Sequence, residues 1–236
     1  MKIKFALVLV VVFTFVSAVY SQDKTILKRA DEYALALKNY QALKTPTSVV
    51  GVIAKGKAVS AMLDEMEKLS DADYAKLEKT MKGYTINRNE IVFVEPDLKF
   101  FSTLVKTHGT PADIAYFALK LQIRPENIWA IYNQQQTDVT GCVLYGKGFL
   151  TGIYGKALQF KKTYPKDYTE DVDKEIADIA NEFRDGTCAC SSRATVEQEY
   201  NLFIKTFPND KITPTVKQKL LNLKKNKEFR FNCHPG

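Results

Sequence analysis

Apolar residues recur every three or four positions along most of the chain, the spacing expected for amphipathic α-helices that pack on one another. The clearest run, residues 172–183, has acidic residues between its apolar positions, and Gly186 follows it as a stop signal. The apolar stripes are Val59, Met62, Met66 and Leu69; Leu98, Phe101, Leu104 and Val105; Ile114, Phe117, Ala118 and Leu121; Val172, Ile176, Ile179 and Phe183; Val196, Tyr200 and Phe203; Val216, Leu220 and Leu223. This pattern predicts a mainly helical protein.

Helix-start signals agree with the stripes. In "TPAD", residues 110–113, Thr110 is a candidate N-cap, a proline occupies the first helical position, and Asp113 is the acid at the third. Ser70 with Asp73 forms a similar start. These signals place the beginning of one helix at each of the two motifs.

A single segment resembles a β-strand: "EIVFVEP", residues 90–96. One strand makes no sheet alone, and residues 229–231 are a candidate partner. The chain has no internal repeat and no Pro/Gly/Ser linker. We therefore predict an all-α fold over residues 22–236: one globular domain of packed amphipathic helices, with one short β-hairpin or strand pair.

Residues 1–21 have the features of a secretory signal peptide. Lys2 and Lys4 precede an apolar run of twelve residues from Phe5 to Val16, and small residues follow. Because a membrane-spanning helix needs about 20 apolar residues, we expect the leader to be cleaved; an uncleaved anchor is the alternative. The small residues allow cleavage after Ala18 or after Ser21, and we favour Ser21. The sequence thus predicts a secreted or periplasmic protein with no transmembrane segment after the leader is removed.

The chain has four cysteines, at positions 142, 188, 190 and 233. In an oxidising compartment cysteines pair, but a bond between Cys188 and Cys190 would be strained. Two pairings remain open, and both tie the segment around residue 189 to Cys142 and to Cys233. Each bond would close a loop of more than forty residues and stabilise the fold by up to about 4 kcal/mol. Metal binding or thiol chemistry is the weaker alternative.

Glycines concentrate in residues 141–156, "GCVLYGKGFLTGIYGK". The part "GCVLYGKG" is one residue from the phosphate-binding loop pattern, but Gly148 stands where that pattern needs a hydroxyl for magnesium. Close approach of a helix to a neighbour is the plainer explanation of Gly148 and Gly152. The functional alternative is a binding groove in which these glycines lie with Tyr145 and Tyr154. No cofactor and no bound metal is predicted.

Enzymatic signatures are weak. The chain has neither the Gly-x-Ser-x-Gly elbow nor the His-Glu-x-x-His zinc helix. His108 lies near several acids, but a cation at a helix carboxyl end is favourable without any function. A carboxylate pair of the glycosidase type has Glu90, Glu95 and Asp113 as its best candidates, with His108 nearby.

Positive charge is concentrated at the carboxyl end. The formal net charge is +7, and residues 211–230 hold seven basic residues against one acid. Lys217, Lys224 and Lys225 are therefore candidates for docking an anionic protein surface or envelope polymer; a solvated helix face is the alternative. Nucleic acid is not expected as a partner, because aromatic and arginine contacts are not interleaved with the lysines.

Two functions are consistent with these observations. The first is a non-enzymatic exported binding or interaction protein, such as an inhibitor, a neutralising partner or an envelope-associated factor. The second is a hydrolase that acts on an envelope or extracellular polymer through a Glu/Asp pair. The missing catalytic motifs favour the first. The sequence leaves the ligand, the oligomeric state and the choice between periplasm and medium open.

Overall fold

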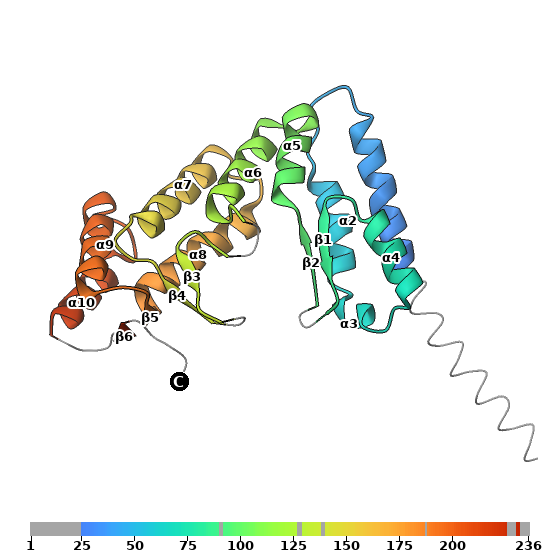
Figure 1. Ribbon diagram of the computed structural model, residues 1–236. Coiled ribbons are helices and arrows are strands. Elements are labelled where there is room, and N and C mark those ends of the chain that lie inside the picture. Colours follow the sequence, from blue (N-terminus) through green and yellow to red (C-terminus); the bar gives the residue numbers. More distant parts are fainter. Residues whose placement is uncertain are drawn as a thin grey trace, which may run out of the picture. The chain divides into compact units, whose positions relative to one another are not determined.

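The computed structural model describes residues 25–89, 92–126, 129–137, 140–186, 188–225 and 230–231. Most of these residues are helical, which confirms the predicted fold class (Figure 1). The predicted signal peptide, residues 1–21, lies outside the described residues. None of the described helices has both the length and the apolar content needed to cross a membrane.

The chain divides into two compact units, Met1–Ile114 and Ala115–Gly236. We call them unit 1 and unit 2 and describe each by itself. The expectation that residues 22–236 form one domain stays a prediction.

Unit 1 combines helices with one β-hairpin. A helix over residues 25–41 comes first. The elements that follow are α2 (Val50–Ser60), α3 (Leu63–Met66), α4 (Asp71–Thr80), β1 (Tyr84–Asn87), β2 (Phe93–Pro96) and α5 (Leu98–His108). Strand β2 lies within the segment predicted from the sequence, but it pairs antiparallel with β1 and not with residues 229–231.

The core of unit 1 is built on aromatic rings. Tyr84 makes edge-to-face contacts with Tyr33 and Phe101, with ring centroids 5.2 and 5.7 Å apart. The predicted stripe on α5 is buried in full. The stripe from Val59 to Leu69 also turns inward at Val59, Met66 and Leu69, but the helix breaks between α2 and α3.

Helix α6 (Pro111–Ile123) begins at the predicted "TPAD" start. Thr110 and Asp113 form a reciprocal capping box: the Thr110 N–H donates to Asp113 Oδ2 at 2.8 Å, and the Asp113 N–H donates to Thr110 Oγ1 at 3.2 Å. The start at Ser70 is confirmed too, because the Asp73 N–H donates to Ser70 Oγ at 3.2 Å. Both local signals therefore work as the sequence indicates.

Unit 2 consists of helices and a small four-stranded sheet. Its helices beyond α6 are α7 (Phe149–Thr163), α8 (Thr169–Asp185), α9 (Arg193–Thr206) and α10 (Thr213–Lys224). Its strands are β3 (Asn133–Gln135), β4 (Gly141–Val143), β5 (Cys188–Ala189) and β6 (Arg230–Phe231). β3 and β4 are antiparallel, whereas β4, β5 and β6 run parallel in that order. This second sheet was not predicted, since each strand is too short to show a period of two.

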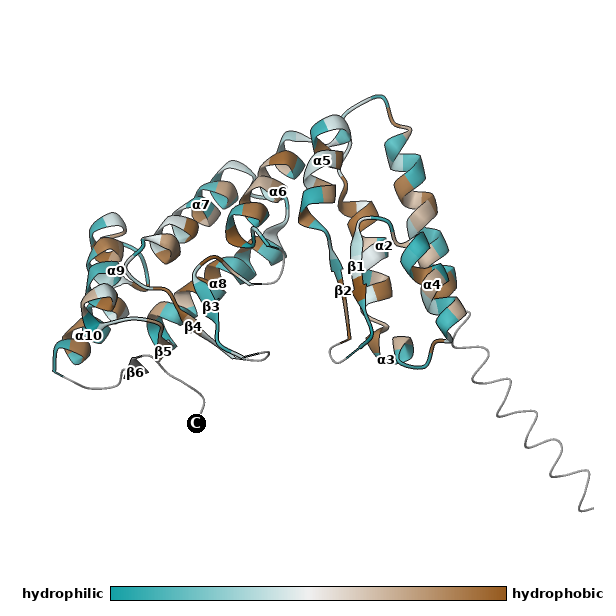
Figure 2. Ribbon diagram, viewed as in Figure 1, coloured by the Kyte–Doolittle hydropathy of each residue, from teal (hydrophilic) through white to brown (hydrophobic). Residues whose placement is uncertain are grey.

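The core of unit 2 follows the predicted stripes on α8, α9 and α10, all of whose members are buried. The same helices carry hydrophilic and hydrophobic bands (Figure 2). Phe203 is central, with its ring centroid 4.4 Å from that of Phe183 and 5.3 Å from that of Tyr154. Aromatic contacts of this kind add to the burial of apolar area.

The predicted stripe on α6 is only partly correct: Phe117 is buried and Leu121 is half-buried. Ile114 and Ala118 are exposed, whereas Tyr116, Leu119 and Ile123 are buried. One polar contact favours the buried position of Tyr116. The Tyr116 hydroxyl donates to Asp171 Oδ2 of α8 at 3.3 Å.

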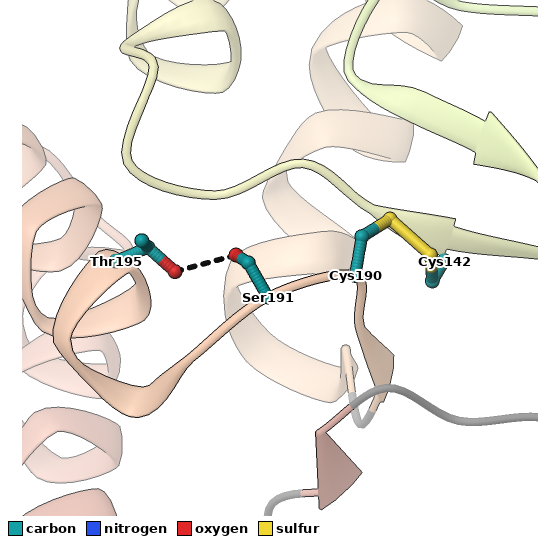
Figure 3. Close-up of a disulfide and its surroundings, with 4 residues drawn as sticks. All are labelled: Cys142, Cys190, Ser191 and Thr195. Atoms are coloured by element: carbon teal, nitrogen blue, oxygen red, sulfur yellow. Dashed lines mark hydrogen bonds between the residues drawn. A yellow bond between two sulfur atoms is a disulfide. The ribbon is translucent and has the colours of Figure 1, made fainter.

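One disulfide joins Cys142 on β4 to Cys190, directly after β5, with the Cα atoms 5.0 Å apart (Figure 3). It selects one of the two pairings left open by the sequence. Cys188 is disulfide-bonded as well, and the remaining predicted cysteine, Cys233, lies outside the described residues. Beyond the bond, the Ser191 and Thr195 hydroxyls are 2.6 Å apart at the start of α9.

Candidate functional site

The acids and the histidine considered for catalysis have different surroundings. Glu90 lies outside the described residues, and Glu95 is exposed on β2. His108 is half-buried at the end of α5, with its Nδ1 3.3 Å from the Leu43 carbonyl oxygen and its ring against Tyr40. Asp113 is fully buried in its capping box. Glu95, His108 and Asp113 do not line the hollows beside α6 and α7 or the concavity at the end of α8.

The tyrosines expected beside the glycines lie in the core. Tyr145 is buried, and its hydroxyl donates to the Glu182 carbonyl oxygen at 3.0 Å. Tyr154 is buried, and its hydroxyl donates to Asp210 Oδ2 at 3.0 Å. Burial raises the pKa of both phenols, so both stay neutral donors. Neither ring lines a described cavity.

The loop that resembles a phosphate-binding loop does hold an anion, and the anion belongs to the protein itself. The carboxylate of buried Glu199 on α9 accepts from the N–H groups of Gly146 at 3.0 Å and Gly148 at 2.8 Å through Oε2. Its Oε1 accepts from the Thr151 N–H at 3.1 Å and from the Thr151 hydroxyl at 2.7 Å. Gly146 and Gly148 have positive φ, of 84° and 72°, which turns their N–H groups toward one point. The cradle therefore ties α7 to α9.

The three lysines proposed for docking are exposed at the carboxyl end of unit 2. Lys217 and Lys224 lie on α10, and Lys225 is its C-cap. The opposite face of α10 is buried through its apolar stripe. Cations in a last helical turn are favourable for the helix dipole, so the arrangement fits a solvated face as well as a docking surface.

Residues of α6 and α7 in unit 2 line a groove between them. It consists of two hollows, of about 250 and about 450 Å³, that share Gln122 and Lys156. From here on we call these two hollows together the α6–α7 groove. The first holds Gly148, Phe149 and Gly152, and the second extends along α6 to Ala115.

The floor and the rim of the α6–α7 groove differ in character. Leu119, Ile153 and Phe160 are buried and form an apolar floor. Ala118 and Gly152 are exposed on the walls, and a Cβ added to Gly152 would meet no atom within 4 Å. The glycine therefore leaves open space, which corrects the expectation that Gly152 lets a neighbouring helix approach closely.

Polar groups lie where the two hollows meet, at Gln122 and Lys156, and also along the second hollow, at Gln159, Thr163 and Tyr164. Lys156 Nζ donates to Gln122 Oε1 at 2.5 Å, which links α7 to α6 across the groove. Among the described residues that line the two hollows, Lys156 is the one charged side chain. The site thus consists of two mostly apolar hollows, with a single amine at the point where they meet.

An ion pair on the other side of α6 fixes that helix. Glu175 Oε1 of α8 lies 2.5 Å from both Lys120 Nζ and Arg124 Nη1. Burial works to raise the pKa of Glu175, but the two cations outweigh it and hold that pKa below its ordinary value. Since a buried ion pair holds its partners in one geometry, α6 presents its other face to the groove.

The sequence indicated part of this site. It singled out Gly148 and Gly152, and its stripe on α6 contains Ala118 and Leu121, which line the groove. It missed Lys156, which reads as an ordinary surface lysine of an amphipathic helix. The signal that could have found it is its spacing of four from Gly152, which puts both on one face of α7.

No protein family, curated protein or solved structure matches this chain.

Proposed function

We propose that this protein is an exported, non-enzymatic binding protein that holds an amphiphile, an apolar chain with an acidic head group, in the α6–α7 groove. The observation that carries the proposal is the groove's composition: an apolar floor along two adjoining hollows, with Lys156 as the charged group. Ligand sites are commonly concave and mostly apolar, with a few polar groups that orient the ligand. The apolar chain would lie on Leu119, Ile153 and Phe160, and the head group would pair with Lys156.

Export is supported by two features. Residues 1–21 have the pattern of a signal peptide, and a disulfide such as Cys142–Cys190 persists in oxidising compartments. Mass analysis of protein recovered outside the cytosol should find the chain beginning at Gln22. A full-length chain with reduced thiols in the cytosol would contradict this part of the proposal.

The groove can be tested with cis-parinaric acid, a long-chain acid whose fluorescence rises in an apolar site. We expect saturable binding by the wild-type protein. Gly152→Leu should abolish it, because the added side chain enters open space in the groove and clashes with no protein atom at its Cβ. The matched control is Gly51→Leu on α2, where an added Cβ also meets no atom within 4 Å; it should bind as the wild type does.

The head group and the chain can be tested separately. Lys156→Gln should weaken the binding of the acid by about tenfold, because a charge-assisted hydrogen bond is lost. The same substitution should leave the binding of the methyl ester unchanged. Removing one CH₂ from the chain should weaken binding by up to about fourfold. Equal binding by Gly152→Leu and the wild type would overturn the proposal.

A further inference from the structure

Unit 2 has a second concavity, of about 360 Å³, at the carboxyl end of α8 and beside the small sheet. Its walls include Trp129, Asn133, Asn181, Glu182, Asp185 and Cys188. They hold an indole, two carboxamides and two carboxylates, and the described lining has no lysine or arginine. This chemistry is opposite to that of the α6–α7 groove.

Glu182 is the carboxylate that a ligand would meet. It is half-buried, and no hydrogen bond or ion pair to its carboxylate is found within the described part of the chain. Burial, and then the charge of Asp178, raises the pKa of Glu182. The carboxyl end of α8, which carries a partial negative charge, lies at the same place. Unpaired negative charge in a partly dehydrated site costs free energy that a bound cation would offset.

Asp185 is partly neutralised already. Arg184 Nε lies 3.6 Å from Asp185 Oδ2, with both side chains largely exposed, and Arg184 also donates to Asn181 Oδ1. Such exposed pairs contribute little. Asp185 therefore adds to the negative potential, whereas Glu182 is the direct partner.

Trp129 supplies an aromatic wall. Its Cζ3 atom lies 3.2 Å from where a Cβ on Gly141 would be, so the indole packs close to the backbone of β4. The next residue of β4, Cys142, is fixed to Cys190 by the disulfide (Figure 3). A tryptophan face is the best aromatic partner for a cation, and this one lines the same concavity as Glu182.

We infer that this concavity binds an organic cation, an alkylammonium group that lies against Trp129 and pairs with Glu182. The inference is independent of the proposed function, because it concerns other residues and the opposite charge. The described residues contain no group of three or more His, Cys, Asp or Glu side chains arranged to hold a metal ion. The ammonium group can belong to a small free cation or to a lysine side chain of a polypeptide.

The chain contains one tryptophan, so its fluorescence reports on this site directly. The protein is titrated in two arms at constant ionic strength, with choline chloride and with an uncharged-terminus peptide that contains one lysine. We expect a saturable fluorescence change in at least one arm, and the stronger arm identifies the source of the cation. Sodium chloride should give no saturable change.

Three variants make the test specific. Glu182→Gln should weaken binding by about tenfold or more, while Glu170→Gln, an exposed acid in the first turn of the same helix, should leave it unchanged. Trp129→Leu, measured by calorimetry, should also lose binding. Glu182→Gln should be at least as stable as the wild type at neutral pH, because it removes a charge that burial disfavours. No saturable change in either arm, or equal binding by Glu182→Gln and Glu170→Gln, would overturn the inference.

Discussion

Each unit buries a carboxylate at the amino end of a helix, but the two carboxylates are held by different parts of the chain. In unit 1, Asp113 accepts from the N–H and the hydroxyl of Thr110, three residues before it, at 2.8 Å each. The Ser48 hydroxyl and the Val49 N–H add longer contacts of 3.2 and 3.4 Å. In unit 2, Glu199 accepts its four bonds from residues 48 to 53 positions away.

This difference explains which carboxylate could be predicted. A capping box depends on residues within one helical turn, so the motif "TPAD" is enough to predict it from the sequence. The cradle around Glu199 depends on the positive φ of Gly146 and Gly148 and on the path that brings α9 to the start of α7. Asp113 thus combines a local capping box with two contacts from residues 65 and 64 positions away. The four hydrogen bonds of Glu199 are all long-range.

The largest expected effect is on the stability of unit 2, which contains the Cys142–Cys190 disulfide. The double variant Cys142→Ser/Cys190→Ser removes a bond that closes a 48-residue separation, which should cost unit 2 up to about 4 kcal/mol. Trp129 lies in unit 2, so its fluorescence follows that unit alone, while far-UV circular dichroism follows both. In the double variant we expect the unfolding transition seen by fluorescence to shift to lower urea concentration. A second transition, seen by circular dichroism alone, should stay at its wild-type urea concentration.

A single transition, seen by both probes and shifted equally, would contradict the separation of the units. It would instead confirm the one domain over residues 22–236 that the sequence predicts. Matched conditions without reductant are needed, because Cys188 is also disulfide-bonded.

Helix stripes could be predicted wherever apolar side chains alone face the core. Val172, Ile176, Ile179 and Phe183 on α8 are all buried, as their spacing indicates. On α6 the prediction holds only in part, because Lys120 and, directly after the helix, Arg124 turn inward to Glu175, a residue more than fifty positions later. The spacing of apolar residues cannot predict that a lysine or arginine side chain turns inward. Tertiary packing decides which acid pairs with it.

The candidate site, like the helix stripes, could be predicted only where local spacing decides the structure. The spacing of Gly148 and Gly152 indicated close approach, but spacing does not reveal whether a glycine faces protein or open space. In the functional alternative for the glycine-rich segment, Tyr145 and Tyr154 line a groove, but both rings are buried and each hydroxyl donates to an acceptor of the protein itself. Those acceptors are 37 and 56 residues away, beyond the reach of local patterns.

The next effect tests the long-range cradle. Glu199→Ala leaves three N–H groups and a hydroxyl without their acceptor, and we expect a loss of about 3 kcal/mol of unfolding free energy, followed by Trp129 fluorescence in urea. Glu197→Ala, two residues earlier on α9 and not buried, should change stability by less than about 0.5 kcal/mol. Acetate, a carboxylate of matching chemistry, should restore part of the loss in Glu199→Ala and none in Glu197→Ala. Equal effects of the two substitutions would show that the cradle contributes nothing.

The smallest effect tests the local capping box of unit 1 against an exposed copy of the same motif. Asp113→Ala removes a buried acceptor of four bonds and should cost about 2 kcal/mol, whereas Asp73→Ala, in the exposed Ser70–Asp73 start of α4, should cost about 0.5 kcal/mol. Urea unfolding followed by far-UV circular dichroism measures both. Because the two boxes share their spacing and differ in burial and in the contacts from Ser48 and Val49, the gap between the two losses measures what tertiary packing adds to a local signal. Equal losses would mean that Asp113, like Asp73, acts through its own helical turn alone, and the contrast between Asp113 and Glu199 would then be one of purely local against long-range stabilisation.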